Sequence, residues 1–431
     1  MTKIVIVGGG AGGMEIVTKL GRKLGKKGKA EITLVDRCDH HIWKPLLHEL
    51  ATGSLDEGLN ALDYRVHAAR NGYRFEQGML HGIDRGAKQL ILSPMMDDQG
   101  GEILPERRID YDFLVLGVGA VTNDFGIAGV QQHCDFLDLT EEAMLLRRKI
   151  RNRFLQYAKE HNVETEHFQI SIVGAGATGV EMAAEMHHAA NTLRGYGYDI
   201  NEDLLQVNLI EASNRVLPRI DKLHICDAVG RELGKLGVNV MTNTRISEVQ
   251  ADGMLTSEGQ FIPSDMVIWS AGVKGHPMLS TLGLETSETD QILVHPSCQS
   301  VTDPAIFAFG DCAACPQEDG SWVPPRGQTA RQMALLVGEN IQKLMEDSSA
   351  TLGEYVYRDL GAFINMSRFH TVGNLLSCVG GGMTVKGKLA RWVYTTLYRR
   401  HLIALHGVWR GLLLMTLNGL QRLMRPELKL H

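Results

Sequence analysis

Short apolar runs that end in glycine or other small residues recur along the chain. Residues 3–7 read KIVIV and lead into a glycine loop, and residues 168–173 read FQISIV and lead into a second one. Continuous runs of this length are typical of strands buried in a parallel sheet, and a helical pattern follows each loop. Three further runs of this kind cover residues 111–116, 266–269 and 306–309. The pattern predicts an α/β fold with parallel sheets.

The two glycine loops have the same spacing. Each reads G-x-G-x-x-G, with Gly8, Gly10 and Gly13 in the first loop and Gly174, Gly176 and Gly179 in the second. Corresponding glycines lie 166 positions apart, and so do Glu15 and Glu181 in the helices that follow. In a dinucleotide-binding turn these glycines allow the tight turn, the approach of a pyrophosphate, and close packing of helix on strand. Two copies in this context predict two Rossmann-type domains; the alternative is a pair of ordinary strand-to-helix turns.

An acidic residue ends the strand that follows each loop. The strand EITLVD ends at Asp36, and the strand QVNLIE ends at Glu211. A carboxylate at this position accepts hydrogen bonds from the hydroxyls of an adenosine ribose and repels a 2′-phosphate. The second site is therefore predicted to favour NADH over NADPH, with Arg215 close enough to leave NADPH use open. Asp311, just after the run 306–309, is predicted to bind a cofactor hydroxyl or else to cap the following segment.

The C-terminal part of the chain is basic although the whole chain is acidic. The 431 residues have a formal net charge of −6, whereas residues 386–431 contain nine lysines and arginines and one acid, Glu427. The overall charge argues against a nucleic-acid-binding protein. A basic tail on an acidic protein instead suggests an anionic surface as partner.

Two stretches of this tail have an apolar face at helical spacing. No apolar run reaches the roughly 18 residues of a spanning helix. A helix lying in a membrane interface is predicted, with packing in a dimer interface or in the core as the alternatives. The positions that share this face are Leu389, Trp392, Val393, Thr396 and Leu397 in the first stretch and Leu412, Met415, Leu420 and Leu423 in the second.

Seven cysteines are scattered along the chain apart from one close pair, Cys312 and Cys315. An odd number at irregular spacing favours reduced thiols over a disulfide framework. The pair is predicted to be small residues packed beneath a cofactor, with a redox disulfide or half of a metal site as alternatives. No second pair nearby completes four ligands, so no metal site is predicted.

Beyond the two loops, several segments resemble the type II NADH:quinone oxidoreductases, which are flavoproteins with two dinucleotide-binding domains. The most specific segments are HIWKPLLHELATGSLDEG (41–58), GAVTNDFGIAGV (119–130), GATGVEMAAE (176–185), FGDCAACP (309–316), PPRGQTARQMA (324–334) and KLARWVYTTLYRRHLIALHG (388–407), so the similarity spans nearly the whole chain. The quinone motif of the family, A-Q-x-x-x-Q, reads GQTARQ here. Gly327 replaces the alanine, and Arg331 fills a variable position.

The resemblance implies which residues bind FAD. Asp36 would bind the ribose, Asp311 the ribityl chain, and Lys44 and Leu80 would lie near the flavin nucleotide. The first loop would hold the pyrophosphate. Its residues are Gly8, Gly9, Gly10, Ala11, Gly12 and Gly13.

The resemblance also assigns the two substrates. NADH would be bound by the second loop and Glu211, with Gly272 on its path. Glu181 would lie where nicotinamide and flavin meet and would position or relay protons. Gln328 and Gln332 would hold the quinone from one side of a helix; the alternative is that they are polar residues on a solvated face. The residues of the second loop are Gly174, Gly176, Ala177, Thr178 and Gly179.

A domain order and a function follow from the same resemblance. Residues 1–120 and 275–335 would form the FAD-binding domain, residues 121–274 an inserted NADH-binding domain, and residues 336–431 a segment for dimer or membrane association. The enzyme would pass a hydride from NADH to FAD and two electrons to ubiquinone or menaquinone in a respiratory chain, without pumping protons. It would be peripheral on the cytoplasmic face of a bacterial inner membrane. The rival hypotheses are a related flavoenzyme with sulfide:quinone, disulfide or ferredoxin chemistry, and a flavin-bearing NADH sensor.

Overall fold

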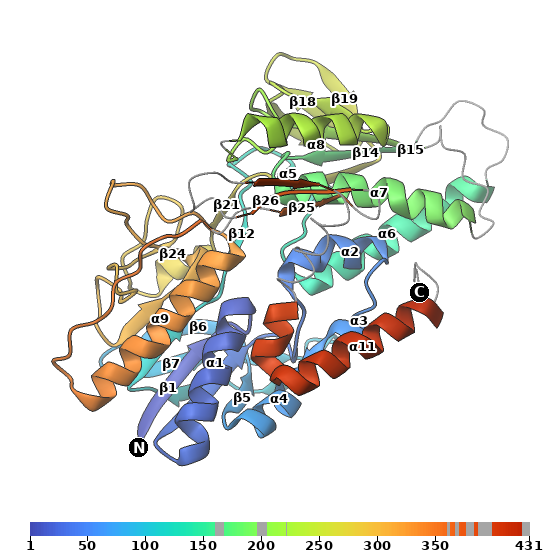
Figure 1. The fold of residues 1–431 in the computed structure, drawn as a ribbon. Helices are drawn as coiled ribbons and strands as arrows, with labels where there is room; N and C mark the ends of the chain where they lie inside the picture. The colour runs from blue at the N-terminus through green and yellow to red at the C-terminus, as the bar shows by residue number, and fades with distance from the viewer. Residues whose placement is uncertain are drawn as a thin grey trace.

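Two five-stranded sheets form the centre of the structure, a computed structural model that describes residues 1–159, 168–195, 205–220, 222–359, 363–366, 370–375, 383–386 and 399–424 (Figure 1). Neighbouring strands are parallel in both sheets, which confirms the predicted fold class at this level. The first sheet has the order β23 (Ile306–Ala308), β11 (Phe113–Leu116), β1 (Thr2–Val7), β2 (Ala30–Asp36), β5 (Arg74–Gln77). The second has the order β13 (Cys134–Asp135), β20 (Met266–Trp269), β14 (Phe168–Val173), β15 (Leu205–Ile210), β16 (Asn239–Met241).

The apolar runs of the sequence are the inner strands of these sheets. The runs at 3–7, 168–173 and 266–269 become β1, β14 and β20. The strand predicted at 111–116 begins only at Phe113. Tyr111 instead donates its amide to the Lys88 carbonyl, and the Asp112 carboxylate accepts from the Lys3 amide at 2.7 Å.

A helix follows the first strand of each sheet, as the pattern predicts. α1 (Ala11–Lys23) follows β1, and α7 (Ala177–Gly195) follows β14. α9 (Gly327–Glu346) packs along α1. Further helices in the described part of the chain are α2 (Leu47–Thr52), α3 (Glu57–Asn60), α4 (Tyr64–Asn71), α5 (Val130–His133), α6 (Thr140–Lys159), α8 (Leu223–Lys235), a helix at 399–406 and α11 (Val408–Met424), with short 3-10 helices η1 (Gly25–Lys27), η2 (Lys44–Leu46), η4 (Pro277–Thr281) and η5 (Gly310–Cys312).

The chain passes between the two sheets through a short antiparallel ribbon. It consists of β12 (Ala120–Thr122) and β21 (Val273–Gly275), with Ala120 opposite Gly275. Smaller sheets surround the large ones. They are β6 (Leu80–Asp84), β7 (Gln89–Leu92) and β10 (Arg107–Asp110); β17 (Ile246–Gln250), β18 (Gly253–Thr256) and β19 (Phe261–Pro263); β25 (Phe363–Met366), β26 (His370–Leu375) and β27 (Met383–Lys386); and the pairs β3 (His40–His41) with β4 (Leu62–Asp63), β8 (Met95–Met96) with β9 (Glu102–Leu104), and β22 (Ile292–Leu293) with β24 (Ala313–Ala314).

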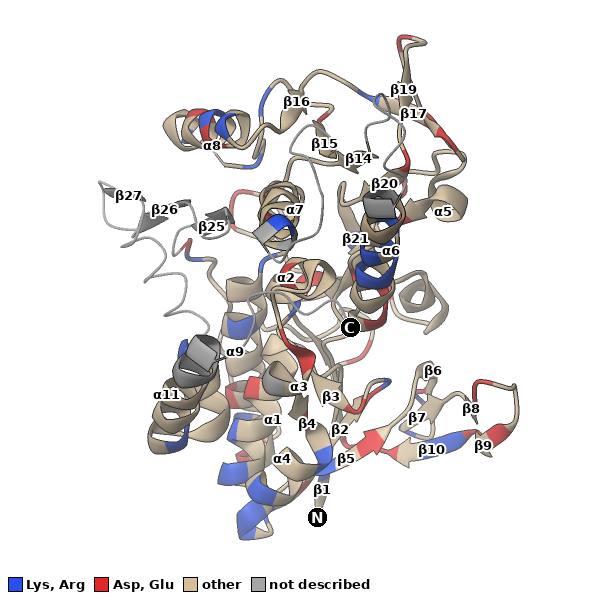
Figure 2. Ribbon diagram, turned by 90° about the vertical axis from the view of Figure 1, so that its right-hand side faces the viewer, with Lys and Arg blue, Asp and Glu red and all other residues tan. Residues whose placement is uncertain are grey.

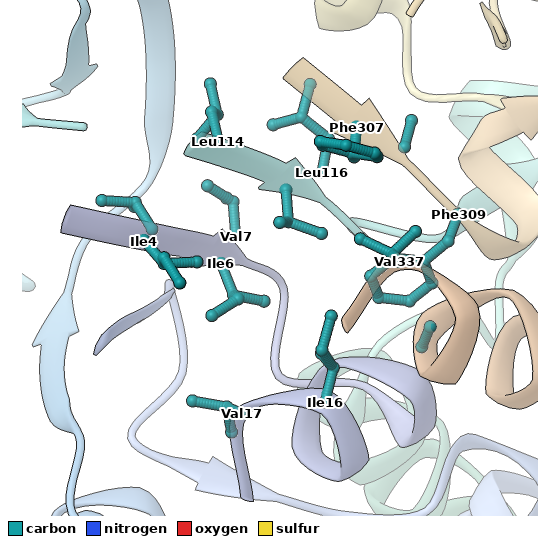
Figure 3. Close-up of a cluster of buried hydrophobic side chains, with 14 of the residues drawn as sticks. Ile4, Ile6, Val7, Ile16, Val17, Leu114, Leu116, Phe307, Phe309 and Val337 are labelled. Atoms are coloured by element: carbon teal, nitrogen blue, oxygen red, sulfur yellow. The ribbon is translucent and has the colours of Figure 1, made fainter. Parts of the chain in front are cut away.

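One core fixes α1 and α9 against the first sheet (Figure 3). Ile4 of β1, Phe307 of β23, Ile16 of α1 and Val337 of α9 are all fully buried. Burying one such side chain contributes about 1.5–3 kcal/mol. Gly338 of α9 faces α1, where a Cβ would be in ordinary van der Waals contact with Ile16 at 3.4 Å. The N-terminal ends of both helices, which carry candidate site residues, are therefore held on a rigid base.

We call the parts of the chain built around the first and the second five-stranded sheet the first unit and the second unit. The helix of residues 399–406, which precedes α11, is docked on the first unit. Arg22 of α1 donates to the Ala404 carbonyl at 3.2 Å, and His67 of α4 lies 3.1 Å from the Leu405 carbonyl. These contacts satisfy carbonyls that the last turn of a helix leaves free. α11 follows after Gly407 and runs toward the C-terminus (Figure 1). Among the described helices none is long and apolar enough to cross a membrane. The first predicted amphipathic stretch, 389–397, lies outside the described residues.

Candidate functional site

The first and third glycines of both loops are required by the backbone itself. Gly8 and Gly174 both have φ +102°, and a Cβ would lie 2.3 Å from the Gly117 oxygen in the first loop. In the second loop a Cβ on Gly174 would lie 2.7 Å from the Ala271 Cα. The third glycines pack in the same way: a Cβ would lie 1.8 Å (first loop) or 1.9 Å (second loop) from the carbonyl oxygen of the first glycine. The two loops are therefore matching structures, as their spacing predicts.

The middle glycine of each loop is free of such contacts. A Cβ on Gly10 or Gly176 would meet no heavy atom within 4 Å. Each of these glycines directly precedes a helix, since α1 begins at Ala11 and α7 at Ala177. The first amides of a helix lack partners within it and favour anions. The predicted loop residues, including Gly9, Gly12 and Thr178, thus lie at two helix N-termini with open space at the middle glycine.

Asp36 is attached to the first loop by hydrogen bonds. Its Oδ2 accepts from the Gly9 amide at 2.6 Å, and its Oδ1 accepts from the Cys38 amide at 2.9 Å. Burial raises the pKa of Asp36, and the two amides oppose that rise. A carboxylate has about four lone-pair sites, so two remain for other donors such as ribose hydroxyls.

Glu211 repeats this arrangement in the second loop. Its Oε2 accepts from the Ala175 amide at 2.9 Å, and its Oε1 accepts from the Ser213 amide at 2.8 Å. Arg215 donates to the Pro218 carbonyl at 3.2 Å, so part of its guanidinium is already engaged away from Glu211.

Asp311 carries a buried oxygen that lacks a partner. Within the described part of the chain its Oδ1 is buried and makes no hydrogen bond. Burial raises the pKa of Asp311, and the charge of Lys44 opposes this. The alternative that Asp311 caps the following segment is wrong, because Phe309 occupies the cap position of η5. An orphaned carboxylate oxygen after β23 fits a cofactor hydroxyl.

The other residues predicted near the cofactors differ in accessibility. Lys44 is half exposed and donates to the Ala120 carbonyl at 3.0 Å and to Asp138 at 3.3 Å. The side chain of Leu80 packs in the core of the first unit. Gly272 has φ +67°, and a Cβ there would lie 2.5 Å from the ring of Phe125.

Glu181 is buried where α7 meets α2. His48 of α2 places Nδ1 3.7 Å from Glu181 Oε2. Glu185, one turn further along α7, is also buried and accepts from the Ser54 hydroxyl. Burial lowers the pKa of His48, so its ring is neutral near pH 7. His48 lies inside the segment HIWKPLLHEL that resembles the family, but no motif in the sequence marks it as a partner of Glu181.

Gln328 and Gln332 lie one turn apart in α9, as predicted. The helix begins at Gly327, with Arg326 as its cap residue and Pro324–Pro325 just before it. The two glutamines have different surroundings. Gln328 Nε2 donates to Asp359 at 3.2 Å, whereas Gln332 Oε1 accepts from the Tyr355 hydroxyl at 3.3 Å. The Nε2 of Gln332 is buried and has no hydrogen-bond partner among the described residues. Tyr355 was not predicted, because no motif marks it.

The close cysteine pair makes separate contacts. The thiol of Cys312 lies 3.3 Å from the Phe309 carbonyl, and that of Cys315 lies 3.8 Å from the Pro316 carbonyl; the neighbouring thiol of Cys315 and burial raise the pKa of Cys298. All three are buried free thiols. In the described ranges no group of three or more histidines, cysteines or acids is arranged to hold a metal ion.

Comparison with known proteins agrees with this geometry. A model of the pyridine nucleotide-disulphide oxidoreductase family matches residues 2–334. The chain is 41% identical over 447 residues to the type II NADH:quinone oxidoreductase of Haemophilus influenzae, and the alignment covers 100% of both chains. An NDH2 structure from Plasmodium falciparum in complex with NADH has a TM-score of 0.83 at 18% identity, covering 99% of this chain and 100% of that one. The sulfide:quinone oxidoreductase of Aquifex aeolicus has a TM-score of 0.72 at 18% identity, covering 94% and 92%.

The two similar structures establish only the fold of this chain. Their names give them different electron donors, so the fold by itself does not identify the donor. Together with the family model, the duplicated loops and sheets define the pyridine nucleotide-disulphide oxidoreductase class. Because the full-length identity to the Haemophilus influenzae protein is 41%, the chain belongs to the type II NADH:quinone oxidoreductases.

Proposed function

We propose that the chain is an FAD-dependent NADH:quinone oxidoreductase that works without pumping protons. The observation that carries the proposal is the duplicated arrangement of glycine loop and acid, since hydride transfer from NADH to a flavin needs two dinucleotides on one chain. The full-length relationship to a type II NADH:quinone oxidoreductase supports this donor and this acceptor.

FAD fits the first unit. The loop Gly8–Gly13 would hold its pyrophosphate, Asp36 has lone pairs left for its ribose, and Asp311 has an unpartnered buried oxygen for its ribityl hydroxyls. The charge of Lys44 would favour the carboxylate form of Asp311 against the effect of burial, which raises its pKa. When bound, FAD accepts a hydride from nicotinamide and passes two electrons to the acceptor.

NADH fits the second unit. The N-terminus of α7 would hold its pyrophosphate and Glu211 its ribose, while the charge of Glu211 would repel a 2′-phosphate. Glu181 would lie at the nicotinamide end of the bound NADH. His48 would hold the Glu181 carboxylate in position and would share a proton with it.

The quinone would be held at the polar face of α9. Quinone carbonyls accept hydrogen bonds, and the Nε2 of Gln332 is a buried donor with no described partner. Tyr355 holds the other end of this amide, and Asp359 holds Gln328. This arrangement favours a binding role for Gln332 over a merely solvated one.

We also propose the domain division 1–120 with 275–335 for FAD, 121–274 for NADH, and 336–431 for association with a membrane or a second subunit. The ribbon of β12 and β21 lies at both junctions of the inserted domain, which supports the division. The protein would be peripheral on the cytoplasmic face of a bacterial inner membrane.

α11 supports the membrane proposal. Its exposed apolar side chains are Val408, Trp409, Leu412, Leu413 and Leu417, with exposed fractions of 44% to 86%. Figure 2 shows basic residues on α11 and at the neighbouring end of α1. Apolar residues beside basic ones suit a helix in the headgroup region of an anionic membrane. The side chains of Leu420 and Leu423 lie outside the described part of the structure.

Charging this face should abolish membrane binding. The double variant Leu412→Glu/Leu413→Glu is expected to lower the ratio of bound to free protein at least tenfold, since each leucine buried in lipid contributes about 1.5–3 kcal/mol. Co-sedimentation with vesicles containing anionic lipid measures it. A matched variant, Ser257→Glu/Gln260→Glu, adds the same charge at an exposed turn of the second unit and should bind normally. Equal sedimentation of both variants would contradict the assignment of this face.

Two absorbance experiments test the function as a whole. NADH should bleach the flavin of the purified protein, and a short-chain quinone should restore its colour. In Gln332→Leu the bleaching should be normal and the recolouring at least tenfold slower, because a hydrogen bond to the quinone is lost. A flavin that NADH bleaches but no quinone restores would favour the sensor hypothesis, and bleaching by sulfide rather than NADH would favour the sulfide-oxidising relatives.

A further inference from the structure

Phe125 has a backbone conformation that burial in a core does not explain. Its φ is +52°, in the left-handed region that bulky side chains rarely adopt. Leu217 has the same φ but is only 3% exposed, so core packing can hold it there. Phe125 is 59% exposed. Here the strained backbone places an aromatic ring on the surface, and strain of this kind points to a functional role.

Hydrogen bonds from three sides hold the turn that carries this ring. The Phe125 amide donates to Asn123 Oδ1 at 2.9 Å. The buried indole of Trp269, at the end of β20, donates to the Asn123 carbonyl at 2.9 Å. Lys274 of β21 donates to Asp124 Oδ1, also at 2.9 Å. The turn is thus attached to the end of β20 and to β21, and the position of the ring is fixed by the fold.

The ring lies on Gly272, close to the second glycine loop. A Cβ on Gly272 would lie 2.5 Å from Phe125 Cζ, so the ring fills the place of the missing side chain. The preceding residue, Ala271, is packed against the loop, because a Cβ on Gly174 would lie 2.7 Å from the Ala271 Cα. The Ser270 hydroxyl donates to the Gly174 carbonyl at 3.1 Å. Segment 270–272 therefore connects the second loop directly to the Phe125 ring.

The strand order indicates which half of a dinucleotide would meet the ring. A dinucleotide lies across the carboxyl ends of the strands, and β14 lies between β20 and β15. Glu211, the proposed ribose ligand, follows β15, and the loop for the pyrophosphate follows β14. The other half, which carries the nicotinamide, would then lie over the end of β20. From there β21 leads to η5, which it contacts and which carries Asp311, the proposed FAD ligand.

We propose that the exposed ring of Phe125 is the apolar contact for the nicotinamide half of the nucleotide. This inference rests on the proposed function, which places NADH at the second loop. A phenyl ring packs favourably against a flat heterocycle, and its face also attracts the positive charge of oxidised nicotinamide. Gly272 is required beneath the ring, since any side chain there would displace it. The left-handed backbone of Phe125 serves to bring the ring to this position.

The test compares two ligands that differ in the nicotinamide. The flavin-loaded enzyme is titrated by calorimetry with NAD⁺ and with ADP-ribose, which lacks the nicotinamide; neither reduces the flavin. In Phe125→Asn the Kd for NAD⁺ should rise about tenfold and the Kd for ADP-ribose should stay unchanged. Phe125→His keeps a flat ring, mostly neutral at about pH 8, and should recover part of the affinity. An unchanged Kd for NAD⁺ in Phe125→Asn, or equal losses with both ligands, would overturn the proposal.

Denaturant titration separates this role from a structural one. Phe125→Asn should unfold at the same or a higher denaturant concentration, because asparagine adopts a left-handed backbone more readily than phenylalanine does. A clearly lower midpoint would show that the ring serves the fold, against the proposal. As a matched control, Phe261→Asn removes a ring that is 41% exposed in β19, before β20 begins, and should leave both Kd values unchanged. If the unmodified enzyme binds NAD⁺ as expected but no quinone restores its reduced flavin, the proposed function fails and the role of Phe125 does not.

Discussion

Gly174→Ala is expected to abolish NADH binding and to destabilise the NADH-binding unit. The three nearest neighbours of the new Cβ would be backbone atoms at 2.7 to 3.0 Å, and φ at Gly174 is +102°. The Ala271 Cα at 2.7 Å and the Ala271 nitrogen at 2.8 Å cannot swing aside as the end of a flexible side chain can. Overpacking costs about 1–3 kcal/mol and a left-handed backbone about 1–2 kcal/mol more. We therefore expect a loss of about 3 kcal/mol in the free energy of unfolding, measured by denaturant titration.

Gly176→Ala provides the matched control. The same methyl group there meets no heavy atom within 4 Å, and Gly176 has no left-handed φ. Stability should change by less than about 1 kcal/mol, while NADH affinity should still fall at least tenfold, because the methyl group fills the space that a pyrophosphate needs. Unchanged NADH binding in Gly176→Ala would show that the second loop is only a structural turn.

Replacing Glu211 should change the preference between the two nicotinamide nucleotides. In Glu211→Gln the amide oxygen can replace one of the acceptors for Ala175 and Ser213, while the negative charge is lost. Hydrogen bonds to a charged group are worth about 1.5–3 kcal/mol, so kcat/KM for NADH should fall about tenfold to a hundredfold. The value for NADPH should fall less or rise, because the repulsion of its 2′-phosphate is removed.

Steady-state kinetics with both nucleotides measures this change, and NADH titration of the flavin colour checks that binding is the affected step. Arg215 limits the expected gain for NADPH, since its guanidinium already donates to the Pro218 carbonyl. If the ratio of kcat/KM for NADH to that for NADPH stays the same in Glu211→Gln, Glu211 does not select the nucleotide.

The parts of the site that depend on local sequence could be predicted. Glycine spacing, strand length and the acid after the second strand are relations between residues at most about 40 positions apart in the sequence. The two loops, Asp36 and Glu211 have the arrangement that these relations predict. The helix of Gln328 and Gln332 follows from two prolines and a four-residue spacing in the same way.

The parts that depend on contacts between distant segments could not be predicted. Arg331 and Glu15 are 316 residues apart, His401 and Glu15 386 apart, and His48 reaches Glu181 from a different element. Arg331 even falls at a variable motif position, where its identity gave no signal. Burial decides the chemistry of these groups, and only the packed structure shows which side chains are buried together.

The position of β23 has a consequence for synthesis of the protein. The first sheet needs β23 beside β11, and 190 residues separate Leu116 from Ile306. At about 5–20 residues per second the ribosome takes about 10–40 s to make that stretch. During this interval all strands of the second sheet emerge and can pair, while the apolar strand β11 has an open edge that favours aggregation. A nascent chain that stalls before Ile306 would therefore contain all strands of the second sheet, whereas the first sheet would lack β23 and, with it, Asp311.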